Sequence, residues 1–485
     1  MRLSTIWEAA KEIQVYGEVD VAVAGGGPAG VCAALAAARL GMRVVLIEQM
    51  GFLGGVNTAA GVNGIGGWQH DLDGRPLVAG IAQEIMVKLS EIEGSDPEVI
   101  RDVFRIREDR PTYREGGLGC YWIRSNPEMM KLLLDRMLRD AGVRVVLHAG
   151  AVAPIMTENK VSGLYMESKS GRQAVLAKVT IDCTGDGDIA ARAGAPFELG
   201  RPQDGYCQPM SMIFTIGGGK EAELHYNPWE DQSHLPPLAK DRYRLAVRQA
   251  RELGEIRYNP NDIFCAATPL NRKHSDTLSV NFTRIQRLNA VDADELTQAE
   301  MQGREQVFEG LRFMRKYIIG NENAYLISVP PMIGIRESRR ILGDAYLTGD
   351  NIKTGKRWPD TIARAIYMID THNPTAIGEP SHLEYLDQPY DIPYGCLLPR
   401  GVERLLVAGR CISGDTIALS SFRILATCMN TGEAAGTAAA LAVSGNTTPR
   451  EIDIPLLQCT LTKQGAHISP AFELARQQSE QTEGV

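Results

Sequence analysis

Long apolar runs are missing from this sequence of 485 residues: none reaches the roughly 18 to 20 residues that a membrane-spanning helix needs. Positive charge is not in excess, because 51 Lys and Arg stand against 59 Asp and Glu, a formal net charge of −8. This balance argues against a nucleic-acid partner or an anionic membrane surface. The nine cysteines form no C-x-x-C pair, which indicates reduced thiols rather than a disulfide framework or a zinc site, so no metal is expected.

An export signal is not visible either, since Glu8, Lys11 and Glu12 occupy the region where such a signal needs its apolar stretch. We therefore expect a soluble, cytoplasmic protein. With 44% hydrophobic and 23% charged residues, the chain can bury a large core. Its length predicts two or three domains, or one large domain with insertions.

The first strong motif lies near the amino end. A buried strand over 19–23 leads into a glycine turn over 25–30 and an alanine-rich helix over 31–40, and a second strand over 43–47 ends at Glu48. The order predicts a β-α-β unit. A G-x-G-x-x-G turn in this context, with an acid about 20 residues further on, is typical of dinucleotide binding.

Each residue of the motif has a physical task. Gly25 permits the tight turn, Gly27 lets the backbone approach a pyrophosphate, and Gly30 allows close packing of helix on strand. The helix N-terminus offers N–H groups and a positive dipole end to the phosphates. Glu48 can accept hydrogen bonds from both ribose hydroxyls, and its charge would repel a 2′-phosphate.

The segment after Glu48 favours FAD over NAD. A Gly-rich stretch over 51–67 stands where an ordinary nucleotide fold would already begin its next helix. The glycines within 51–55 would let the backbone approach the rest of a flavin nucleotide without side chains in the way.

Later segments return to the same style. Helical spacing covers 127–141, parallel-type strands are predicted at 143–147, 174–181 and 405–408, and a small-residue helix covers 427–440. Residues from about 217 to 330 are richer in charge and proline, which indicates an inserted second domain or cap.

The sequence resembles the FAD-dependent oxidoreductases of the glutathione-reductase-type flavoprotein group, specifically the FAD_oxidored family near the fumarate reductase flavoproteins. The resemblance rests on GGGPAG at 25–30, IEQMGFLGG at 47–55, DCTGDGDIAARAGAPFELG at 182–200, IGIRESRRILGDAYLTGD at 333–350, IDTHNP at 369–374, LLPRGVERLLVAGRCISGD at 397–415 and FRILATCMNTGEAAGTAAA at 422–440. It covers most of the chain and is specific.

The resemblance implies an α/β protein with a Rossmann-like FAD-binding domain, built on a parallel sheet with a crossover β-meander. A second α+β domain, for substrate or as a cap, interrupts it. The FAD-binding domain would take 1–216 and 386–468, the second domain 217–385, and a polar C-terminal tail 469–485.

Carried over by position, the family's FAD contacts fall on twelve residues. They are Gly25, Gly27, Gly30 and Glu48 for the pyrophosphate and adenosine ribose, Gly54 and Gly55 along the flavin, Ala151 at the adenine, Thr184, Gly185 and Asp186 from a second crossover, and Gly409 and Arg410 beside the flavin ring. The start of the helix near 427–430 would stabilise the anionic reduced flavin at N1 and O2. Without the resemblance, plain packing of this alanine-rich helix is an equal alternative.

Three departures limit the transfer. Asn57, Thr58 and Ala59 stand where fumarate reductases place the histidine that attaches FAD covalently, so we expect non-covalent FAD and do not transfer fumarate as substrate. The redox-active C-x-x-x-x-C of disulfide reductases is absent, which excludes that activity. The glycines at 217–219 lack the rest of a second dinucleotide motif, so a built-in NAD(P)H domain is not expected. Oxygen, a quinone or a carrier protein remain open as electron acceptor.

Candidates for the chemistry are few. Arg336, Arg339 and Arg340 bracket Glu337 and offer planar guanidinium forks for a carboxylate or an oxyanion. Such a cluster is more often a salt-bridge network. The resemblance puts the segment at the boundary of the substrate domain. A role of Arg336 in the site and a structural role are then equal alternatives.

A proton acceptor is predicted at His372. Asp370 stands two residues before it, so on an extended segment both side chains face the same way. A single histidine is ordinarily structural, and that alternative stays open. Tyr394 is a weaker candidate for a substrate hydrogen bond and reads better as a core aromatic.

Together these residues predict an FAD-dependent dehydrogenase or oxidase. It would transfer a hydride between flavin N5 and a small polar, hydroxylated or carboxylated substrate, with His372 as base and Arg336 as anchor. The reverse reaction, reduction of an activated C=C bond, uses the same geometry. A lyase or isomerase in which FAD assists without net electron transfer, and a protein that keeps FAD only as a structural ligand, are the alternatives. The oligomeric state stays open.

Overall fold

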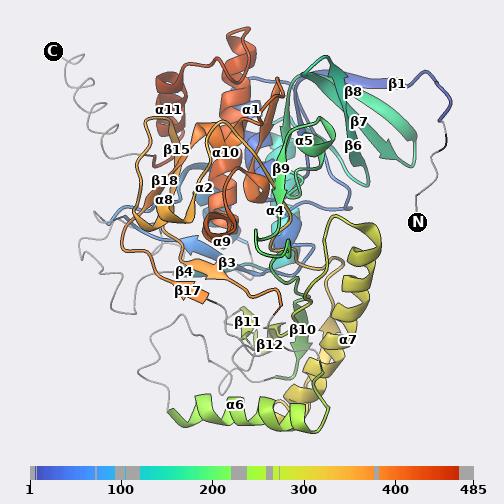
Figure 1. Ribbon diagram of the computed structural model, residues 1–485, viewed down its shortest axis with the longest axis vertical. Helices are drawn as coiled ribbons and strands as arrows, with labels where there is room; N and C mark the ends of the chain where they lie inside the picture. Colours follow the sequence, from blue (N-terminus) through green and yellow to red (C-terminus); the bar gives the residue numbers. More distant parts are fainter. Residues whose placement is uncertain are drawn as a thin grey trace.

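The computed structural model describes residues 6, 8–71, 74–92, 104, 121–219, 237–257, 266–271, 274–375 and 382–468. The predicted C-terminal tail, 469–485, lies outside the described residues. The described elements form a large unit around a mainly parallel sheet and a smaller unit around an antiparallel sheet (Figure 1).

The larger sheet follows the order β5-β2-β1-β8-β7-β6, and β19 pairs with β8 beside this path. Its strands are β1 (Gln14–Ala24), β2 (Val44–Ile47), β5 (Arg144–Val146), β6 (Gly150–Thr157), β7 (Lys160–Ser168), β8 (Gly171–Asp182) and β19 (Leu405–Val407). Parallel pairing joins five of these strands, β1, β2, β5, β8 and β19. An antiparallel meander is formed by β6, β7 and the first half of β8. The predicted parallel sheet with a crossover β-meander is therefore confirmed.

The predicted β-α-β unit is also confirmed. The run of Val and Ala that ends β1, residues 21–24, is fully buried, as expected for a strand covered on both faces. α1 (Pro28–Arg39) starts directly after the glycine turn with proline in its first turn, where a missing N–H costs nothing. Gly41, in the left-handed region at φ 84°, closes the helix and returns the chain to β2.

α10 (Leu425–Ser444) packs directly on α1, and two of its glycines face the α1 backbone. A Cβ added to Gly432 would lie 2.1 Å from Ala29 O, and one added to Gly436 would lie 2.1 Å from Ala33 O. Since both residue numbers rise together along this contact, the two helices run parallel. Their N-terminal ends therefore face the same edge of the sheet.

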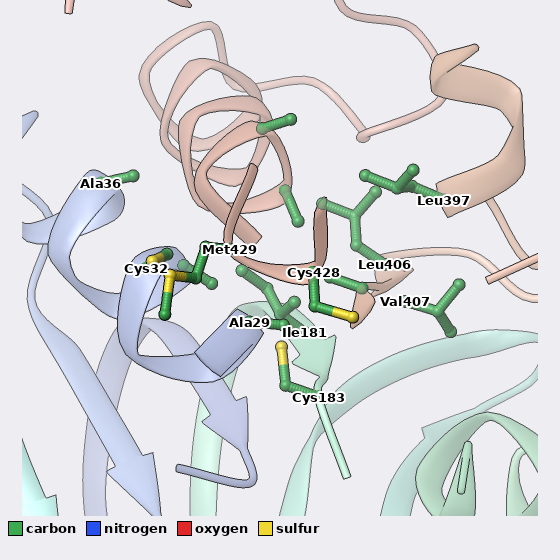
Figure 2. Packing of buried hydrophobic residues seen from close by; sticks show 14 of the residues in the cluster. Ala29, Cys32, Ala36, Ile181, Cys183, Leu397, Leu406, Val407, Cys428 and Met429 are labelled. Carbon is green, nitrogen blue, oxygen red and sulfur yellow. The ribbon is translucent and has the colours of Figure 1, made fainter. Parts of the chain in front are cut away.

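Small side chains and thiols fill the region around this helix pair. Figure 2 shows Ala29 and Cys32 of α1 gathered with Cys428 and Met429 of α10 and with Cys183 at the end of β8. Burial raises the pKa of the Cys32 and Cys183 thiols, so both stay protonated and behave as small apolar residues. All seven cysteines in the described ranges are free.

One acidic side chain lies deep in this core. Glu433 of α10 is 1% exposed, and its Oε2 accepts a hydrogen bond from Ile81 N at 3.0 Å. Ile81 belongs to the first turn of α2 (Gly80–Ser90), so the carboxyl caps that helix. Burial raises the pKa of Glu433 to about 8, which makes it a protonated acid at neutral pH.

The smaller unit has its own sheet and core. Its strands follow the order β11-β12-β10-β13, all antiparallel: β10 (Phe214–Gly217), β11 (Ala266–Asn271), β12 (His274–Asn281) and β13 (Tyr325–Ser328). α7 (Ala293–Tyr317), capped by Asp292, and α6 (Pro237–Glu252) lie with it, away from the larger sheet (Figure 1). The predicted segment 217–385 contributes to both cores, because 278–333 pack in the second core and 341–386 in the first.

The other elements join these units. They are the strands β3 (Gly64–Trp68), β4 (Tyr121–Arg124), β9 (Phe197–Leu199), β14 (Arg339–Ile341), β15 (Thr361–Ala365), β16 (Ile369–Thr371), β17 (His382–Glu384) and β18 (Tyr390–Pro393), the helices α4 (Pro127–Asp140), α5 (Asp188–Arg192), α8 (Gly349–Lys353), α9 (Thr416–Phe422) and α11 (Ile454–Lys463), and the 3-10 turns η1 (Gly55–Asn57), η2 (Tyr394–Leu397) and η3 (Gly409–Cys411). Backbone bridges between Met210 and Ile285 and between Ser211 and Gly334 hold the base of the smaller unit.

Candidate functional site

The glycine turn between β1 and α1 is shaped as its sequence predicts. Gly25 has φ 95°, and a Cβ there would lie 2.6 Å from Cys183 O. A Cβ on Gly30 would lie 1.8 Å from Gly25 O, so that position admits only glycine. Gly27 differs: among the described residues an added Cβ would meet only Gly55 Cα, at 3.8 Å. There is thus room beside Gly27 for a group that is not protein.

Among the residues that the structure describes, no side chain caps the start of α1. Gly27 is the N-cap residue and makes no side-chain hydrogen bond, and Pro28 has no N–H to satisfy. The N–H groups of Ala29 and Gly30 belong to the first turn, where the helix itself supplies no acceptor. Together with the positive end of the helix dipole they form a site suited to phosphate.

Glu48 lies beside this turn, at the carboxyl end of β2. Its Oε2 accepts from Gly26 N at 2.6 Å and its Oε1 from Met50 N at 2.8 Å. Burial raises the pKa of Glu48, and these backbone N–H groups oppose that rise. A carboxylate oxygen can accept two hydrogen bonds, so each oxygen of Glu48 retains capacity for a ribose hydroxyl.

The residues expected to line the flavin and adenine lie next to the same turn. Gly54 N donates to Gly26 O at 2.9 Å, and a Cβ on Gly55 would lie 2.8 Å from Gly27 Cα. Ala151 is the second residue of β6. It follows two residues after Ala149, whose N–H donates to Glu48 O at 3.0 Å. The loop after β2 and the start of β6 therefore flank Glu48 from two sides.

The second crossover reaches the turn from β8. Cys183 N donates to Ala24 O at 2.8 Å, which holds the ends of β8 and β1 together. Thr184 Oγ1 donates to Asp182 Oδ1 at 2.7 Å and accepts from Asp188 N, so it fixes the start of α5. Gly185, at φ 80°, brings the chain close to the Arg410 guanidinium.

Asp186 and Arg410 are joined directly. Arg410 Nη2 lies 2.6 Å from Asp186 Oδ1, and Ser338 Oγ donates to the same oxygen at 2.6 Å. Arg410 Nη1 donates to Ser338 Oγ at 2.8 Å. This polar cluster therefore joins three parts of the chain: the end of β8, the end of β19 and the segment before β14.

Gly409 connects β19 to α10. Its N–H donates to Thr431 Oγ1 at 3.1 Å, and a Cβ there would lie 3.0 Å from Ala29 Cβ. The N-cap residue of α10, Ile424, makes no side-chain cap hydrogen bond. Two parallel helices, α1 and α10, thus present uncapped N-terminal ends at the same edge of the sheet.

These residues fit FAD. The predicted contacts lie at the carboxyl ends of β1, β2, β8 and β19, the edge where open α/β sheets bind their ligands. The room beside Gly27, the N–H groups of α1 and the Glu48 carboxylate match a pyrophosphate with its ribose. The uncapped start of α10 offers a positive end to an anionic reduced flavin. The individual assignments stay predictions.

The predicted proton acceptor lies with a carboxylate. His372 Nε2 is 3.3 Å from Asp370 Oδ1, as the two-residue spacing predicts, and His372 follows directly after the end of β16. His372 N donates to Gln208 Oε1. Arg423 Nη2 donates to Asp370 O and to its Oδ2, both at 3.1 Å. Because Arg423 stands two residues before the first residue of α10, this contact links His372 to the helix end expected at the flavin.

Charge and burial set the protonation of this pair. Burial lowers the pKa of His372 to about 3, although Asp370 opposes the shift. Despite burial, the neighbouring His372, Arg423 and Arg336 hold the pKa of Asp370 below its ordinary value. At neutral pH the imidazole is therefore neutral and the carboxyl is ionised.

Arg336 approaches the pair from the base of the smaller unit. Its Nη1 donates to Pro209 O and to Ser211 Oγ, both at 2.7 Å. Burial and the charges of Arg284 and Arg423 lower the pKa of Arg336, whereas Asp370 raises it. The structure therefore brings Arg336, Asp370 and His372 into one electrostatic group.

The rest of the arginine cluster is structural. Arg340, about 1% exposed, donates to Gly414 O, Gly200 O and Glu337 Oε1. Arg339 pairs with Asp188. Tyr394 is a buried core residue whose hydroxyl donates to Pro449 O at 2.7 Å.

Four polar residues of the group were not among the residues predicted for the site. They are Gln208, Ser211, Arg284 and Arg423. Three come from a segment without a motif. Arg423 precedes the small-residue helix, within the stretch 422–440. Their chain separation from their partners, 53 to 164 residues, is what sequence spacing cannot reveal.

In the part of the chain that the structure describes, no helix combines the length and the apolar character needed to cross a membrane. Within the same ranges, no group of three or more His, Cys, Asp or Glu side chains is arranged to hold a metal ion.

Comparison with known proteins identifies the family. The family model for FAD dependent oxidoreductases matches residues 20–461, while no curated protein matches the chain. Similar solved structures include a geranylgeranyl bacteriochlorophyll reductase-like protein from Thermoplasma acidophilum (14% identity, 92% of this chain and 83% of the other, TM-score 0.40) and a myxobacterial chondrochloren halogenase (13%, 92% and 78%, 0.46). A p-nitrophenol 4-monooxygenase from Pseudomonas putida is a third (12%, 95% and 92%, 0.45). The chain belongs to the FAD-dependent oxidoreductase family and is an FAD-using enzyme.

Proposed function

We propose that this FAD-dependent oxidoreductase transfers a hydride between N5 of its flavin and a small polar substrate that carries a hydroxyl or a carboxylate. FAD, when bound, supplies the site that accepts or donates the hydride. The chain must then supply a group for the accompanying proton and a group that holds the substrate. The observation that carries the proposal is the contact of Arg423, two residues before α10, with Asp370 of the Asp370–His372 pair.

His372 takes the role of proton acceptor. Burial lowers the pKa of His372 and keeps the imidazole neutral, and Asp370 offsets part of the basicity that burial removes. The ionised Asp370, 3.3 Å away, then stabilises the imidazolium that forms. Arg423 in turn holds both the backbone carbonyl and the carboxylate of Asp370, which fixes the pair in place.

Arg336 takes the role of substrate anchor. Two hydrogen bonds fix its Nη1, and the side chain is only partly buried. A guanidinium held in this way presents its remaining N–H groups in one plane, which suits an oxygen-rich substrate. The charge of Asp370 stabilises the Arg336 cation, so the proposed anchor lies in the electrostatic field of the proposed proton acceptor's partner.

A cytoplasmic location is part of this proposal, and the free thiols of the described cysteines support it. The electron acceptor is oxygen, a quinone or a carrier protein. Reduction of an activated C=C bond would use the same residues in reverse, and a lyase or isomerase reaction would leave the flavin oxidised.

The test is anaerobic mixing of the yellow holoenzyme with polyols, hydroxy acids and amines while the flavin absorbance is followed. Bleaching by one of these compounds is the expected result. His372→Ala should then slow bleaching by about 100-fold or more. His382→Ala is the matched control, because His382 is an exposed histidine on β17 that pairs with Glu384, and its rate should equal the wild type.

Two results would overturn the proposal. Turnover of a compound without any bleaching would favour the lyase or isomerase reaction. Unchanged bleaching kinetics in His372→Ala, with normal FAD content, would remove His372 from the proton transfer.

A further inference from the structure

Arg336 is a cation held by neutral groups. Both of its hydrogen bonds within the described residues come from Nη1 and go to a backbone carbonyl, Pro209 O, and a hydroxyl, Ser211 Oγ. No described carboxylate forms an ion pair with it. Its Nε and Nη2 are left for another acceptor, and its partial exposure leaves the side chain reachable.

A second guanidinium shares the same hydroxyl. Arg284 Nη1 donates to Ser211 Oγ at 3.1 Å, and Ser211 Oγ itself donates to Thr283 O at 2.8 Å. Two like charges that converge on one neutral oxygen repel each other. The backbone bridge between Ser211 and Gly334, two residues before Arg336, fixes this arrangement.

Two buried N–H donors next to the Asp370–His372 pair also lack a partner among the described residues. They are Nε2 of Gln208, a residue 4% exposed whose Oε1 accepts from His372 N, and Nε of Arg423, which binds Asp370 through Nη2. A buried donor without an acceptor is costly. The cost is removed when an acceptor binds.

Resting on the proposed function, we propose that the substrate of this enzyme is a carboxylate, and that the anion binds to the free edge of Arg336 between Ser211 and the Asp370–His372 pair. Gln208, Ser211 and Arg423 are then specificity residues in addition to Arg336. The planar edge formed by Nε and Nη2 matches the two oxygens of a carboxylate. The charge of Asp370 nearby disfavours a dianion such as phosphate or sulfate.

The experiment measures binding rather than turnover, so that it is independent of hydride transfer. Acetate and propionate are titrated into the oxidised holoenzyme, and the change in the flavin spectrum gives Kd. Acetamide is the uncharged match to acetate, and inorganic sulfate is the tetrahedral anion. We expect acetate and propionate to bind, acetamide not to bind, and sulfate to bind at least about 10-fold more weakly.

The variants divide the site by residue. Arg336→Gln should weaken acetate binding by about 10- to 100-fold, as expected for loss of hydrogen bonds to a charged group. Arg336→Lys should recover only part of this loss. Ser211→Ala, which releases Nη1 without removing charge, should weaken it less than Arg336→Gln. The control Arg248→Gln removes an exposed arginine of α6 and should leave Kd unchanged.

Several outcomes overturn the inference, and each can be told from failure of the proposed function. Equal binding of acetate and acetamide, or unchanged acetate binding in a folded Arg336→Gln or Ser211→Ala variant, refutes the anion site. Bleaching by a neutral polyol, with no carboxylate bound, refutes it while leaving hydride transfer intact. Carboxylate binding that depends on Arg336, with no compound that bleaches the flavin, supports the anion site and counts against hydride transfer.

Discussion

Glu433 gives a prediction in which the sign and the size both follow from burial. The carboxyl is 1% exposed, and its Oε1 has no hydrogen-bond partner in the described ranges. Burial raises the pKa of Glu433 to about 8, from 4.5 for an exposed glutamate. Between these two values the folded protein binds a proton that the unfolded chain has lost, so this residue makes stability fall as pH rises through that window.

The magnitude comes from the size of the shift. Each pKa unit corresponds to about 1.4 kcal/mol, so the full shift is worth about 5 kcal/mol between about pH 4.5 and pH 8. Glu433→Gln keeps an oxygen that can accept from Ile81 N but cannot ionise. The variant should equal the wild type in stability near pH 4.5 and exceed it progressively, by about 3 kcal/mol at pH 7.

Urea unfolding of the holoenzyme at a fixed excess of FAD, repeated from about pH 5 to pH 8.5, measures this difference. Glu305→Gln is the matched control, because Glu305 is an exposed glutamate of α7. A stability difference between Glu433→Gln and wild type that does not change with pH would show that the buried carboxyl does not take up a proton on folding. A difference that shrinks as pH rises would refute the sign.

Flavin reduction should stay level from about pH 8 to pH 5 in stopped-flow measurements, because burial lowers the pKa of His372 to about 3; a fall centred near the ordinary histidine value would contradict this. Gly27→Ala should fold normally but bind FAD at least about 10-fold more weakly in a fluorescence titration, since its methyl group would take the space beside the turn. Gly30→Ala should not fold, as its Cβ would lie 1.8 Å from a carbonyl oxygen. Gly432→Ala and Gly436→Ala should each lower the melting temperature by forcing α10 off α1, and unchanged melting would show that the helices can separate freely.

Local chemistry made the FAD-binding half predictable. Gly25, Gly30 and Glu48 belong to one β-α-β unit, and their roles depend on neighbours within about one supersecondary motif. The pairing of Asp370 with His372 also follows from local geometry, since alternate residues of a strand share a face. In these cases residues that are close in the sequence are also close in space, so their spacing predicts the contact.

The substrate side could not be predicted in the same way. Ser211 contacts Arg336 across 125 residues of chain, and Arg423 contacts Asp370 across 53. Each contact lies within one unit, Ser211 with Arg336 in the smaller and Arg423 with Asp370 in the larger, but it joins segments that are far apart in the chain. The side chains involved are polar and lie at isolated β-bridges or at helix ends. In such places no hydrophobic periodicity predicts the direction in which a side chain points.

The arginine cluster shows the same limit within five residues. Its three arginines look equivalent in the sequence, yet Arg340 is fixed by buried carbonyls, Arg339 pairs with Asp188, and Arg336 reaches Ser211. The fold separates them because β14 begins at Arg339 and pairs with β9, while the bridge at Gly334 holds the other end of the segment. The partners that these pairings bring near each side chain, and not burial alone, distinguish the three arginines, because Arg336 and Arg339 are both partly exposed.

This short segment also connects the two halves of the site. Ser338 binds Asp186 and Arg410 at the edge where FAD is expected, and Arg336, two residues earlier, binds Ser211 on the substrate side. Because backbone pairing holds both ends of the segment, Ser338 and Arg336 keep a fixed spacing. The same stretch of chain therefore positions the proposed substrate anchor relative to the edge where FAD is expected.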